Sequence, residues 1–393
     1  MEDFKLKTSI FFGEGSLKRL SELQCNKVFI VTDPFMVKSG SINKIVDKFK
    51  NTDMDLSIFS DVVPDPPIEN IIKGVKVIME FDPDVVVALG GGSAIDTAKA
   101  IRLFRNKISN QLQSSTNKKK VKFIAIPTTS GTGSEVTNFS VITDKEKGIK
   151  YPLISDELLA DEAILDAELV KTVPDFITAD TGMDVLTHAI EAYVSLKSTD
   201  YTDALAEKSI KMVFENLIAA YKQGDNMEAR RKMHNASCMA GIAFNSASLG
   251  INHGIAHTIG GRFHLSHGRT NAILLPYVIE FNADMKNTSI YNYSDCSDSN
   301  AAKKYAQIAS ILGLPCPTVR QGVKNLISAI NKLLKDLKIP NSFKEAGLDK
   351  KKFYDELTTL SQKSINDRCS STNPKDLNIE EIIELLKKSY NGK

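Results

Sequence analysis

The sequence has no excess of charge, no long apolar run and no paired cysteines, and each of these absences excludes a class of protein. Its 393 residues carry 50 Lys and Arg against 48 Asp and Glu, a formal charge of +2. A nucleic-acid surface needs clustered excess basic residues, so we expect no such partner. No stretch approaches the roughly 18 unbroken apolar residues of a membrane-spanning helix. The start MEDFKLKTSI lacks the apolar core of a signal peptide. We therefore expect a cytosolic protein that acts on small molecules.

Disulfide frameworks and thiolate zinc sites are also unexpected. The five cysteines form no CxxC pair and are odd in number: Cys25, Cys238, Cys296, Cys316 and Cys369. No internal repeat of fixed period indicates a solenoid. What remains is an ordinary globular composition, 42% hydrophobic and 25% charged, on a chain long enough for two domains.

The first half of the chain alternates short β-branched runs with helical patterns. Strands are predicted over 27–32, 56–59, 84–89 and 122–126, and helices over 42–50, 68–81 and from Ser93. This βαβα order predicts a parallel sheet with helices on both faces. Residues 106–120 have no apolar periodicity, so we expect an exposed connection there.

After about Pro174 the strand signals fade, and segments such as 203–221 and 302–312 repeat apolar residues at helical spacing. Pro174, with Thr178 as the N-cap of the next helix, marks the predicted boundary. We therefore predict an α/β dinucleotide-binding domain with a Rossmann-like parallel sheet over residues 1–176. An all-helical, metal-binding domain is predicted over residues 177–393.

A glycine-rich loop joins a predicted strand to a helix in the run DVVVALGGGSAIDTAKAI. Its members are Gly90, Gly91, Gly92 and Ser93. Glycines let the backbone approach a ligand, and the positive end of the helix favours a pyrophosphate. The spacing differs from GxGxxG, so a plain tight turn stays open as an alternative. Asp96 and Lys99 follow in the first helical turns, where Asp96 can simply favour the helix dipole.

Two further features point to a dinucleotide. The segment PTTSGTGSEVT, residues 127–137, follows another strand and supplies hydroxyl and amide donors, although these are also ordinary turn residues. Asp33 ends the first strand, where its carboxylate can bind the adenosine ribose and repel the 2′-phosphate of NADP. We favour NAD for this reason. A turn residue before Pro34 is the alternative role of Asp33.

Histidines are few but clustered. Asp184 and His188 lie four residues apart on a predicted helix, so both project from one face. Four of the six histidines fall within NHGIAHTIGGRFHLSHG: His253, His257, His264 and His267. A carboxylate with imidazoles suits a divalent metal that keeps an open position for a substrate oxygen, and both iron and zinc accept such ligands. His234 and His264 are expected to be structural.

Together these motifs resemble the iron-containing (group III) alcohol dehydrogenase family, from FFGEGSL near the start to YAQIASILGLP near the end. The stretches GIKYPL, TGMDVLTHAIEA, TDALAEKS and KMHNAS are similar to the propanol dehydrogenases of propanediol utilisation. The resemblance implies the metal ligands Asp184, His188, His253 and His267, with His257 near the nicotinamide as a proton relay. The resulting catalytic set is His257, His253 and His267. The resemblance also implies dinucleotide contacts from Asp33, Gly90, Gly91, Gly92, Ser93, Thr128, Thr129, Thr132 and Lys150.

The activity implied by the resemblance is hydride transfer between NAD(H) and a short-chain primary alcohol or aldehyde, such as propanol or butanol and their aldehydes. Fe²⁺ is the implied metal, with Zn²⁺ as the alternative. Substrates such as 1,3-propanediol or 4-hydroxybutyrate stay open, as does a lyase like dehydroquinate synthase, which shares the two-domain plan. The resemblance further implies a homodimer or larger assembly, in the cytoplasm or with the enzymes of a bacterial microcompartment.

Overall fold

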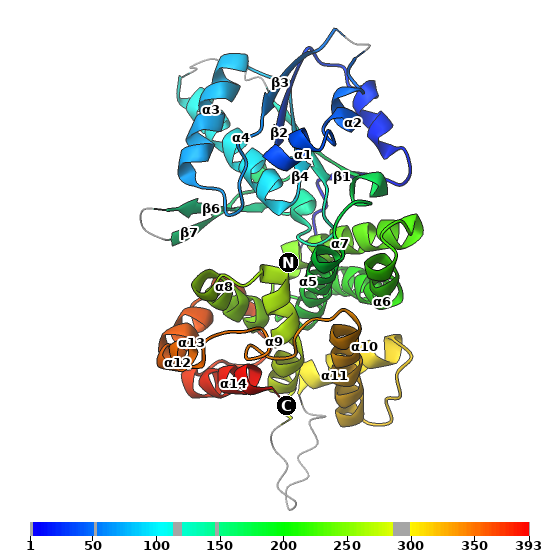
Figure 1. The fold of residues 1–393 in the computed structure, drawn as a ribbon, viewed down its shortest axis with the longest axis vertical. Helices are drawn as coiled ribbons and strands as arrows, with labels where there is room; N and C mark the ends of the chain where they lie inside the picture. The colour runs from blue at the N-terminus through cyan, green and yellow to red at the C-terminus, as the bar shows by residue number, and fades with distance from the viewer. Residues whose placement is uncertain (1–2, 51–52, 113–119, 146–148, 286–298, 393) are drawn as a thin grey trace, which may run out of the picture. The chain divides into compact units, whose positions relative to one another are not determined.

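A computed structural model describes residues 3–50, 53–112, 120–145, 149–285 and 299–392. The chain divides into two compact units, Met1–Thr172 and Val173–Lys393 (Figure 1). The first unit is built around a six-stranded sheet. The described part of the second unit is helical and contains no strand. This is the predicted fold class.

All neighbouring strands of the large sheet are parallel. Their order is β1 (Ser9–Phe12), β8 (Glu162–Leu165), β5 (Lys122–Pro127), β4 (Val85–Gly90), β2 (Lys27–Thr32) and β3 (Asp55–Phe59). Strands β2, β4 and β5 are neighbours and all end at the same edge. The glycine loop after β4 and the PTTSGTGSEVT segment after β5 therefore start side by side.

Alternating side chains of the buried strands pack into two cores, one on each face of the sheet. Phe29 and Val31 belong to the core covered by α3 (Ile68–Phe81) and α4 (Gly92–Leu112). Val28 and Ile30 belong to the core covered by η1 (Ser16–Glu22), α1 (Pro34–Lys38) and α2 (Asn43–Val46). The predicted covering of both faces is confirmed, and it explains why these strands are apolar throughout.

Three local predictions were wrong. The helix predicted over 42–50 ends at Val46, because the chain turns so that Phe49 packs into the core. Helix α4 continues to Leu112, because Ile108 packs against the core, so residues 106–112 are not a loop; residues 113–119 lie outside the described part. Thr178 is not an N-cap, since the helix already begins at Asp175 and the Thr178 hydroxyl donates to the Pro174 carbonyl at 3.0 Å.

An antiparallel pair of strands was not predicted at all. β6 (Phe139–Asp144) pairs with β7 (Ile149–Ile154) in a separate two-stranded sheet. The sequence of β7, IKYPLI, contains Pro152, and a proline argues against a central strand. In a two-stranded sheet both strands are edges, so the missing N–H is tolerated.

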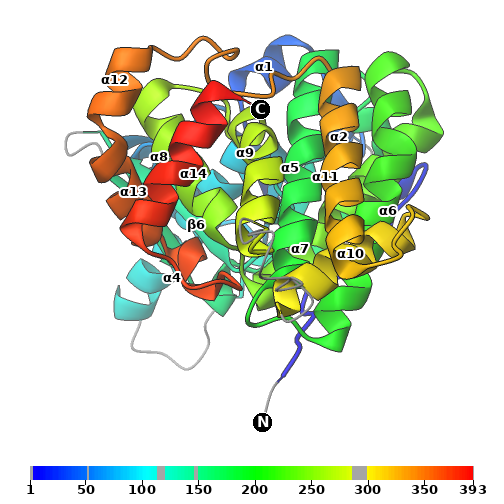
Figure 2. The same ribbon diagram turned by 90° about the horizontal axis from the view of Figure 1, so that it is seen from below.

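The second unit contains ten α-helices and no strand among its described residues. They are α5 (Asp175–Val194), α6 (Asp200–Lys222), α7 (Met227–Ala247), α8 (Ile251–Phe263), α9 (His267–Asn282), α10 (Asn300–Ile311), α11 (Val319–Asp336), α12 (Lys350–Asp355), α13 (Leu357–Ile365) and α14 (Ile379–Asn391), with a short 3-10 turn, η6 (Arg368–Thr372). Helix α5 is buried on nearly all sides and packs against α6, α7 and α9. Figure 2 shows α5 and α9 side by side at the centre of this unit.

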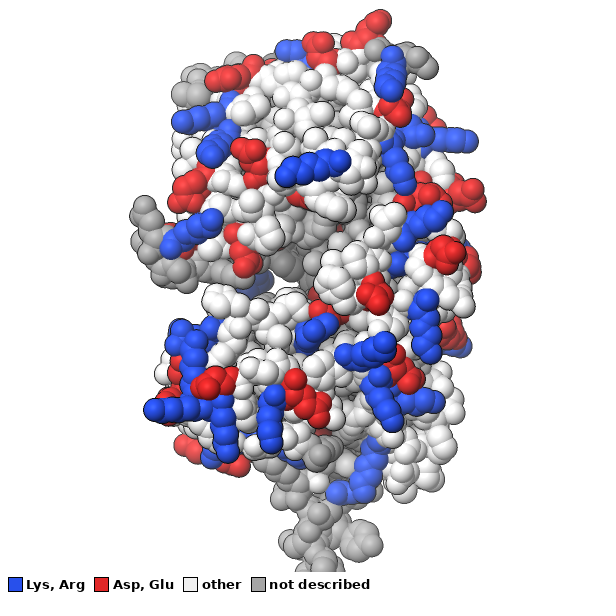
Figure 3. Space-filling model, viewed as in Figure 1, with Lys and Arg blue, Asp and Glu red and all other residues white. Residues whose placement is uncertain are grey.

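Charges of both signs are interspersed over the face drawn in Figure 3. This distribution agrees with the near-neutral composition, and the described residues of that face form no basic patch. Within the described ranges, none of the helices combines the length and the apolar character needed to cross a lipid bilayer.

Candidate metal centre and dinucleotide loops

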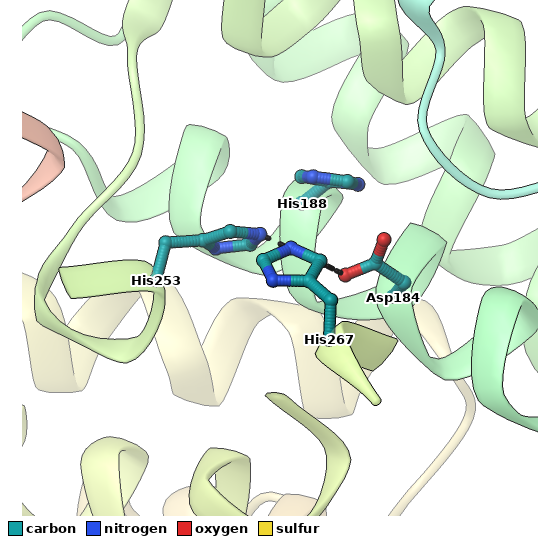
Figure 4. Close-up of side chains that lie close together, drawn as sticks. All are labelled: Asp184, His188, His253 and His267. Atoms are coloured by element: carbon teal, nitrogen blue, oxygen red, sulfur yellow. Dashed lines mark ion pairs between the residues drawn. The ribbon is translucent and has the colours of Figure 1, made fainter. Parts of the chain in front are cut away.

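Three helices of the second unit bring the predicted metal ligands together. Asp184 and His188 project from the same face of α5, because one helical turn separates them. His253 lies in the first turn of α8, and His267 is the first residue of α9. In Figure 4 the four side chains point toward one another. Their ligand atoms all lie within 4.8 Å of one another.

The spacing of these atoms fits a divalent metal. Nε2 of His253 lies 3.7 Å from Oδ1 of Asp184, and Nε2 of His267 lies 3.5 Å from the same oxygen. In tetrahedral coordination with bonds of about 2.0–2.2 Å, neighbouring ligand atoms lie about 3.3–3.6 Å apart, so the His267 distance falls in this range and the His253 distance lies just above it. Three imidazoles and one carboxylate are also donors that both iron and zinc accept. The residues present therefore fit the metal.

A glycine makes the close approach of two of these helices feasible. A Cβ atom on Gly268 would lie 2.2 Å from the backbone oxygen of Asp180, a distance that real Cβ atoms do not adopt. Any larger residue would push the start of α9 away from α5. Because His267 directly precedes Gly268, this contact sets how closely His267 approaches Asp184.

Glu191 is a residue of this centre that the sequence reasoning missed. It is buried on α5, three residues after His188, and its carboxylate is hydrogen-bonded to Nδ1 of His253. Its other oxygen accepts a hydrogen bond from the backbone N–H of Asn252 at 2.8 Å. A carboxylate that holds the far nitrogen of a metal-ligating histidine is a common feature of metal sites. The available signal was its helical spacing from His188 in THAIEA.

The electrostatics of the cluster favour a cation. Burial alone raises the pKa of Asp184, but the imidazoles of His188 and His267 and a hydrogen bond with His253 outweigh it and hold that pKa well below its usual range. Burial lowers the pKa of His253, yet the carboxylates of Glu191 and Asp184 outweigh burial and raise it to about 9. Asp184 is thus ionised, and the centre attracts positive charge.

His257 lies beside the ligands without being one of them. Its ring stacks on His267 with the ring centroids 5.3 Å apart, and its Nδ1 lies 2.9 Å from Oδ2 of Asp367. Burial raises the pKa of Asp367, but the hydrogen bond and charge of His257 outweigh burial and lower it. His234 and His264 do not join the cluster: His234 is buried on α7, and His264 ends α8 in a left-handed conformation.

In the first unit, the two predicted dinucleotide loops contact each other at the carboxyl ends of β4 and β5. The N–H of Thr128 donates to the carbonyl of Gly90 at 3.0 Å. A Cβ atom on Gly91 would lie 3.3 Å from Oγ1 of Thr129, and one on Gly92 would lie 2.8 Å from Cγ2 of Thr132. Helix α4 begins at Gly92, so Ser93 lies in its first turn. Open parallel sheets bind ligands at this edge.

Asp33 caps a helix, a role that differs from the plain turn residue considered for it from the sequence. It is the N-cap of α1, and its Oδ1 accepts from the N–H of Met36 at 3.0 Å. Its Oδ2 lies beside the glycine loop, 3.3 Å from the position of a Cβ atom on Gly90. Asp33 is thus next to the loop with one oxygen not used in the cap. Lys150 is on β7, but its side chain lies outside the described part of the structure.

Asp96 and Lys99 on α4 form hydrogen bonds with the PTTSGTGSEVT segment. Asp96 accepts hydrogen bonds from the Ser134 hydroxyl at 2.7 Å and from the Val141 N–H at 3.0 Å. The buried ammonium of Lys99 donates to Ser134 Oγ at 3.1 Å and to the carbonyl of Thr137 at 2.8 Å. Burial lowers the pKa of Lys99 to about 8. Both side chains therefore connect α4 to the PTTSGTGSEVT segment.

A parallel α/β unit with a glycine loop, together with a helical unit that gathers three imidazoles and a carboxylate, is typical of metal-dependent dehydrogenases. Family models agree. Residues 7–167 match the model described as iron-containing alcohol dehydrogenase, and residues 178–390 match the Fe-containing alcohol dehydrogenase family, C-terminal. The chain belongs to the iron-containing alcohol dehydrogenase family.

Individual proteins agree with this assignment. The chain is 44% identical to the 1-propanol dehydrogenase PduQ of Citrobacter freundii over 98% of this chain and 99% of that protein. It is 40% identical to the NADPH-dependent butanol dehydrogenase of Clostridium saccharobutylicum, over 100% of this chain and 99% of that one. The crystal structure of a 1,3-propanediol oxidoreductase superposes with a TM-score of 0.87 at 30% identity, over 99% of this chain and 100% of that chain.

Longer relatives also match. An aldehyde-alcohol dehydrogenase of Streptococcus pneumoniae is 42% identical over all of this chain but only 46% of its own length. The chain thus spans about half the length of such relatives.

Proposed function

We propose that this protein is a metal-dependent oxidoreductase that transfers a hydride between NAD(H) and a short-chain primary alcohol or its aldehyde. The observation that carries the proposal is the meeting of Asp184, His188, His253 and His267. Nε2 of His267 and Nε2 of His253 lie 3.5 and 3.7 Å from Oδ1 of Asp184. One carboxylate and three imidazoles are donors that suit a catalytic divalent metal. The similarity to PduQ favours 1-propanol and propionaldehyde as substrates.

Asp184, His188, His253 and His267 would hold the metal, Fe²⁺ by family and Zn²⁺ as the alternative. When bound, the metal supplies a Lewis acid that polarises the oxygen of the substrate. Glu191 keeps the hydrogen of His253 on Nδ1, so that Nε2 is the nitrogen with a free lone pair. The carboxylate of Asp367 does the same for His257, because a carboxylate can only accept. Nε2 of His257 is then the atom that takes up or releases the substrate proton.

For the dinucleotide, the proposal rests on residues of the first unit. Gly90, Gly91, Gly92 and Ser93 would bind the pyrophosphate at the start of α4, with Thr128, Thr129 and Thr132 beside them and Lys150 as a further contact. When bound, NAD(H) supplies the hydride acceptor or donor. Asp33 would bind the adenosine ribose and disfavour the 2′-phosphate of NADP. The similarity to a butanol dehydrogenase named as NADPH-dependent makes this preference worth measuring.

We further propose a division of labour between two domains. Residues 1–176 would be the dinucleotide-binding domain and residues 177–393 the metal-binding domain. We propose a homodimer or larger assembly in the cytoplasm, in association with bacterial microcompartment enzymes, as the resemblance to the propanol dehydrogenases of propanediol utilisation implies. We propose that the protein binds neither a nucleic acid nor a membrane.

A second substrate class has its own support, since a 1,3-propanediol oxidoreductase shares the fold at 30% identity. The test is a substrate panel. The protein is purified without oxygen, and NADH formation is followed with ethanol, 1-propanol, 1-butanol, 1,3-propanediol and 4-hydroxybutyrate. The aldehydes are tested in reverse. The highest kcat/KM is expected for 1-propanol or 1-butanol. No turnover of any alcohol or aldehyde with metal present would refute the proposal and favour the lyase.

A further inference from the structure

The side-chain amide of Asn271 lies among the predicted metal ligands. Its Nδ2 is 2.8 Å from Oδ1 of Asp184, 3.1 Å from Nε2 of His253 and 3.1 Å from Nε2 of His267. Asn271 is fully buried on α9, one helical turn after His267, so both side chains project from the same face. One amide group thus contacts three ligand atoms that come from three different helices.

We propose that Asn271 is a positioning residue of the metal centre, which fixes the orientation of the Asp184 carboxylate and the spacing of the ligand atoms. The inference rests on the metal-dependent function proposed above and deepens it. Asn271 is not a ligand in this account. It acts on the metal through Asp184.

Hydrogen bonding determines which end of the Asn271 amide faces the ligands. The Nδ2 of Asn252 lies 3.2 Å from the backbone oxygen of Asn271 and 2.9 Å from its Oδ1. A backbone carbonyl can only accept, so the Asn252 atom that faces it must be the NH₂ group. The Asn271 atom that faces the same NH₂ must then be oxygen. The NH₂ group of Asn271 is therefore the end that faces Asp184.

The contact with Asp184 is compatible with a bound metal. A carboxylate oxygen has lone pairs for both a metal and an N–H donor, whereas an imidazole nitrogen offers a single lone pair. The hydrogen bond from Asn271 to Oδ1 of Asp184 is therefore the contact that persists when the histidines bind the metal. It restricts the rotation of a buried carboxylate, as partners of metal ligands commonly do.

The arrangement also connects the helices of the centre. Asn252 precedes His253 on α8, and its backbone N–H donates to Glu191 on α5 at 2.8 Å. Three buried hydrogen bonds thus join the helices in series. Glu191 on α5 bonds to Asn252 on α8, Asn252 bonds to Asn271 on α9, and Asn271 bonds to Asp184 on α5. Loss of the Asn271 amide interrupts this series at the residue next to the ligands.

The experiment compares metal affinity in Asn271→Ala, Asn271→Leu and a control. Asn271→Leu keeps most of the side-chain volume and removes the donor. The control is Asn282→Ala, which removes another buried amide of α9, one that contacts Asn373 and Tyr305 instead of the ligands. Affinity for Co²⁺ is measured on the metal-free full-length protein by competition with a chromophoric chelator. The visible spectrum of bound Co²⁺ reports the coordination geometry.

Both Asn271 variants are expected to bind Co²⁺ about 10- to 100-fold more weakly, with an altered Co²⁺ spectrum, whereas Asn282→Ala loses stability but keeps the wild-type affinity. Wild-type affinity and spectrum in a folded Asn271 variant would overturn the inference while leaving the metal centre intact. A wild-type protein that binds no Co²⁺ would instead refute the metal centre itself. If neither Asn271 variant folds, Asn252→Ala is measured in the same way, and weaker binding is again expected; unchanged binding overturns the inference.

Discussion

The carboxylate of Glu191 is hydrogen-bonded to Nδ1 of His253, and Nε2 of the same ring lies 3.7 Å from Oδ1 of Asp184. Because a carboxylate can only accept, Nδ1 carries the hydrogen of the neutral ring, and Nε2 is then the nitrogen with a lone pair for a metal. Glu191 therefore sets the tautomer in which His253 can bind a metal.

Glu191→Gln is expected to weaken metal binding about 10- to 100-fold. Both oxygens of Glu191 accept hydrogen bonds, so the glutamine NH₂ would face either the Nδ1–H of His253 or the N–H of Asn252. Metal affinity is measured by chelator competition. The matched control is Glu207→Gln, since Glu207 accepts from the hydroxyl of Tyr193 at 2.7 Å and contacts no predicted ligand. Equal metal affinity in both variants would contradict the role of Glu191.

His267→Ala and His257→Gln should separate a ligand from a proton relay. His267→Ala removes one of four ligand atoms, so metal content and turnover are expected to fall together. His257→Gln leaves those atoms in place, so metal content should stay near wild type while kcat falls about 100-fold, within the usual range for general acid–base catalysis. Metal analysis and steady-state kinetics on the same preparations check both results. Loss of metal from His257→Gln would count against the relay role.

Asp33→Ser and Asp33→Ala test the cofactor preference. Both remove the charge beside the glycine loop, so the ratio of kcat/KM for NADPH over NADH should rise about tenfold or more. Serine is also a good N-cap, so Asp33→Ser should keep the stability of α1, whereas Asp33→Ala should lose about 1 kcal/mol. Kinetics with both cofactors and urea unfolding separate the two effects. An unchanged cofactor ratio in both variants would show that Asp33 only caps the helix.

Glu135 is expected to make the stability of the first unit depend on pH. Burial raises the pKa of this carboxyl from 4.5 to about 7, although the charge of Lys99 lowers it in part. The folded state therefore holds the proton more tightly, so the contribution of Glu135 to stability is fully present below pH 4.5 and is lost as the pH rises to about 7, by up to about 3 kcal/mol. Glu135→Gln should remove this loss and be more stable than wild type at pH 8. Urea unfolding at pH 5 and pH 8 measures it, and the same loss in both proteins would refute the prediction.

The sequence predicted those parts of the fold that depend on local pattern. β2 and α3 occupy the predicted residues 27–32 and 68–81, because a β-branched apolar run marks the first and helical spacing of apolar residues marks the second. The hairpin of β6 and β7 was missed, since Pro152 obscured its pattern. The continuation of α4 to Leu112 was missed because its polar residues hide the few apolar contacts that hold it.

Some residues of the candidate site could also be predicted from the sequence, and others could not. The clustering of histidines and the spacing of Asp184 from His188 were visible in the sequence, and the structure brings Asp184, His188, His253 and His267 together. Glu191 and Asn271 were not recognised. Glu191 has helical spacing from His188, and Asn271 has it from His267, but such spacing is common on helices. These two residues matter because α5, α8 and α9 meet in the folded unit.

Metal-dependent alcohol oxidation is the central claim, and one measurement tests it most directly. The protein is purified without oxygen, its metal content is determined, and NADH formation from 1-propanol is followed before chelation, after chelation and after Fe²⁺ is added back. We predict about one metal per chain, loss of NADH formation on chelation and its return with Fe²⁺. NADH formation that continues at the same rate in the metal-free protein would contradict the account.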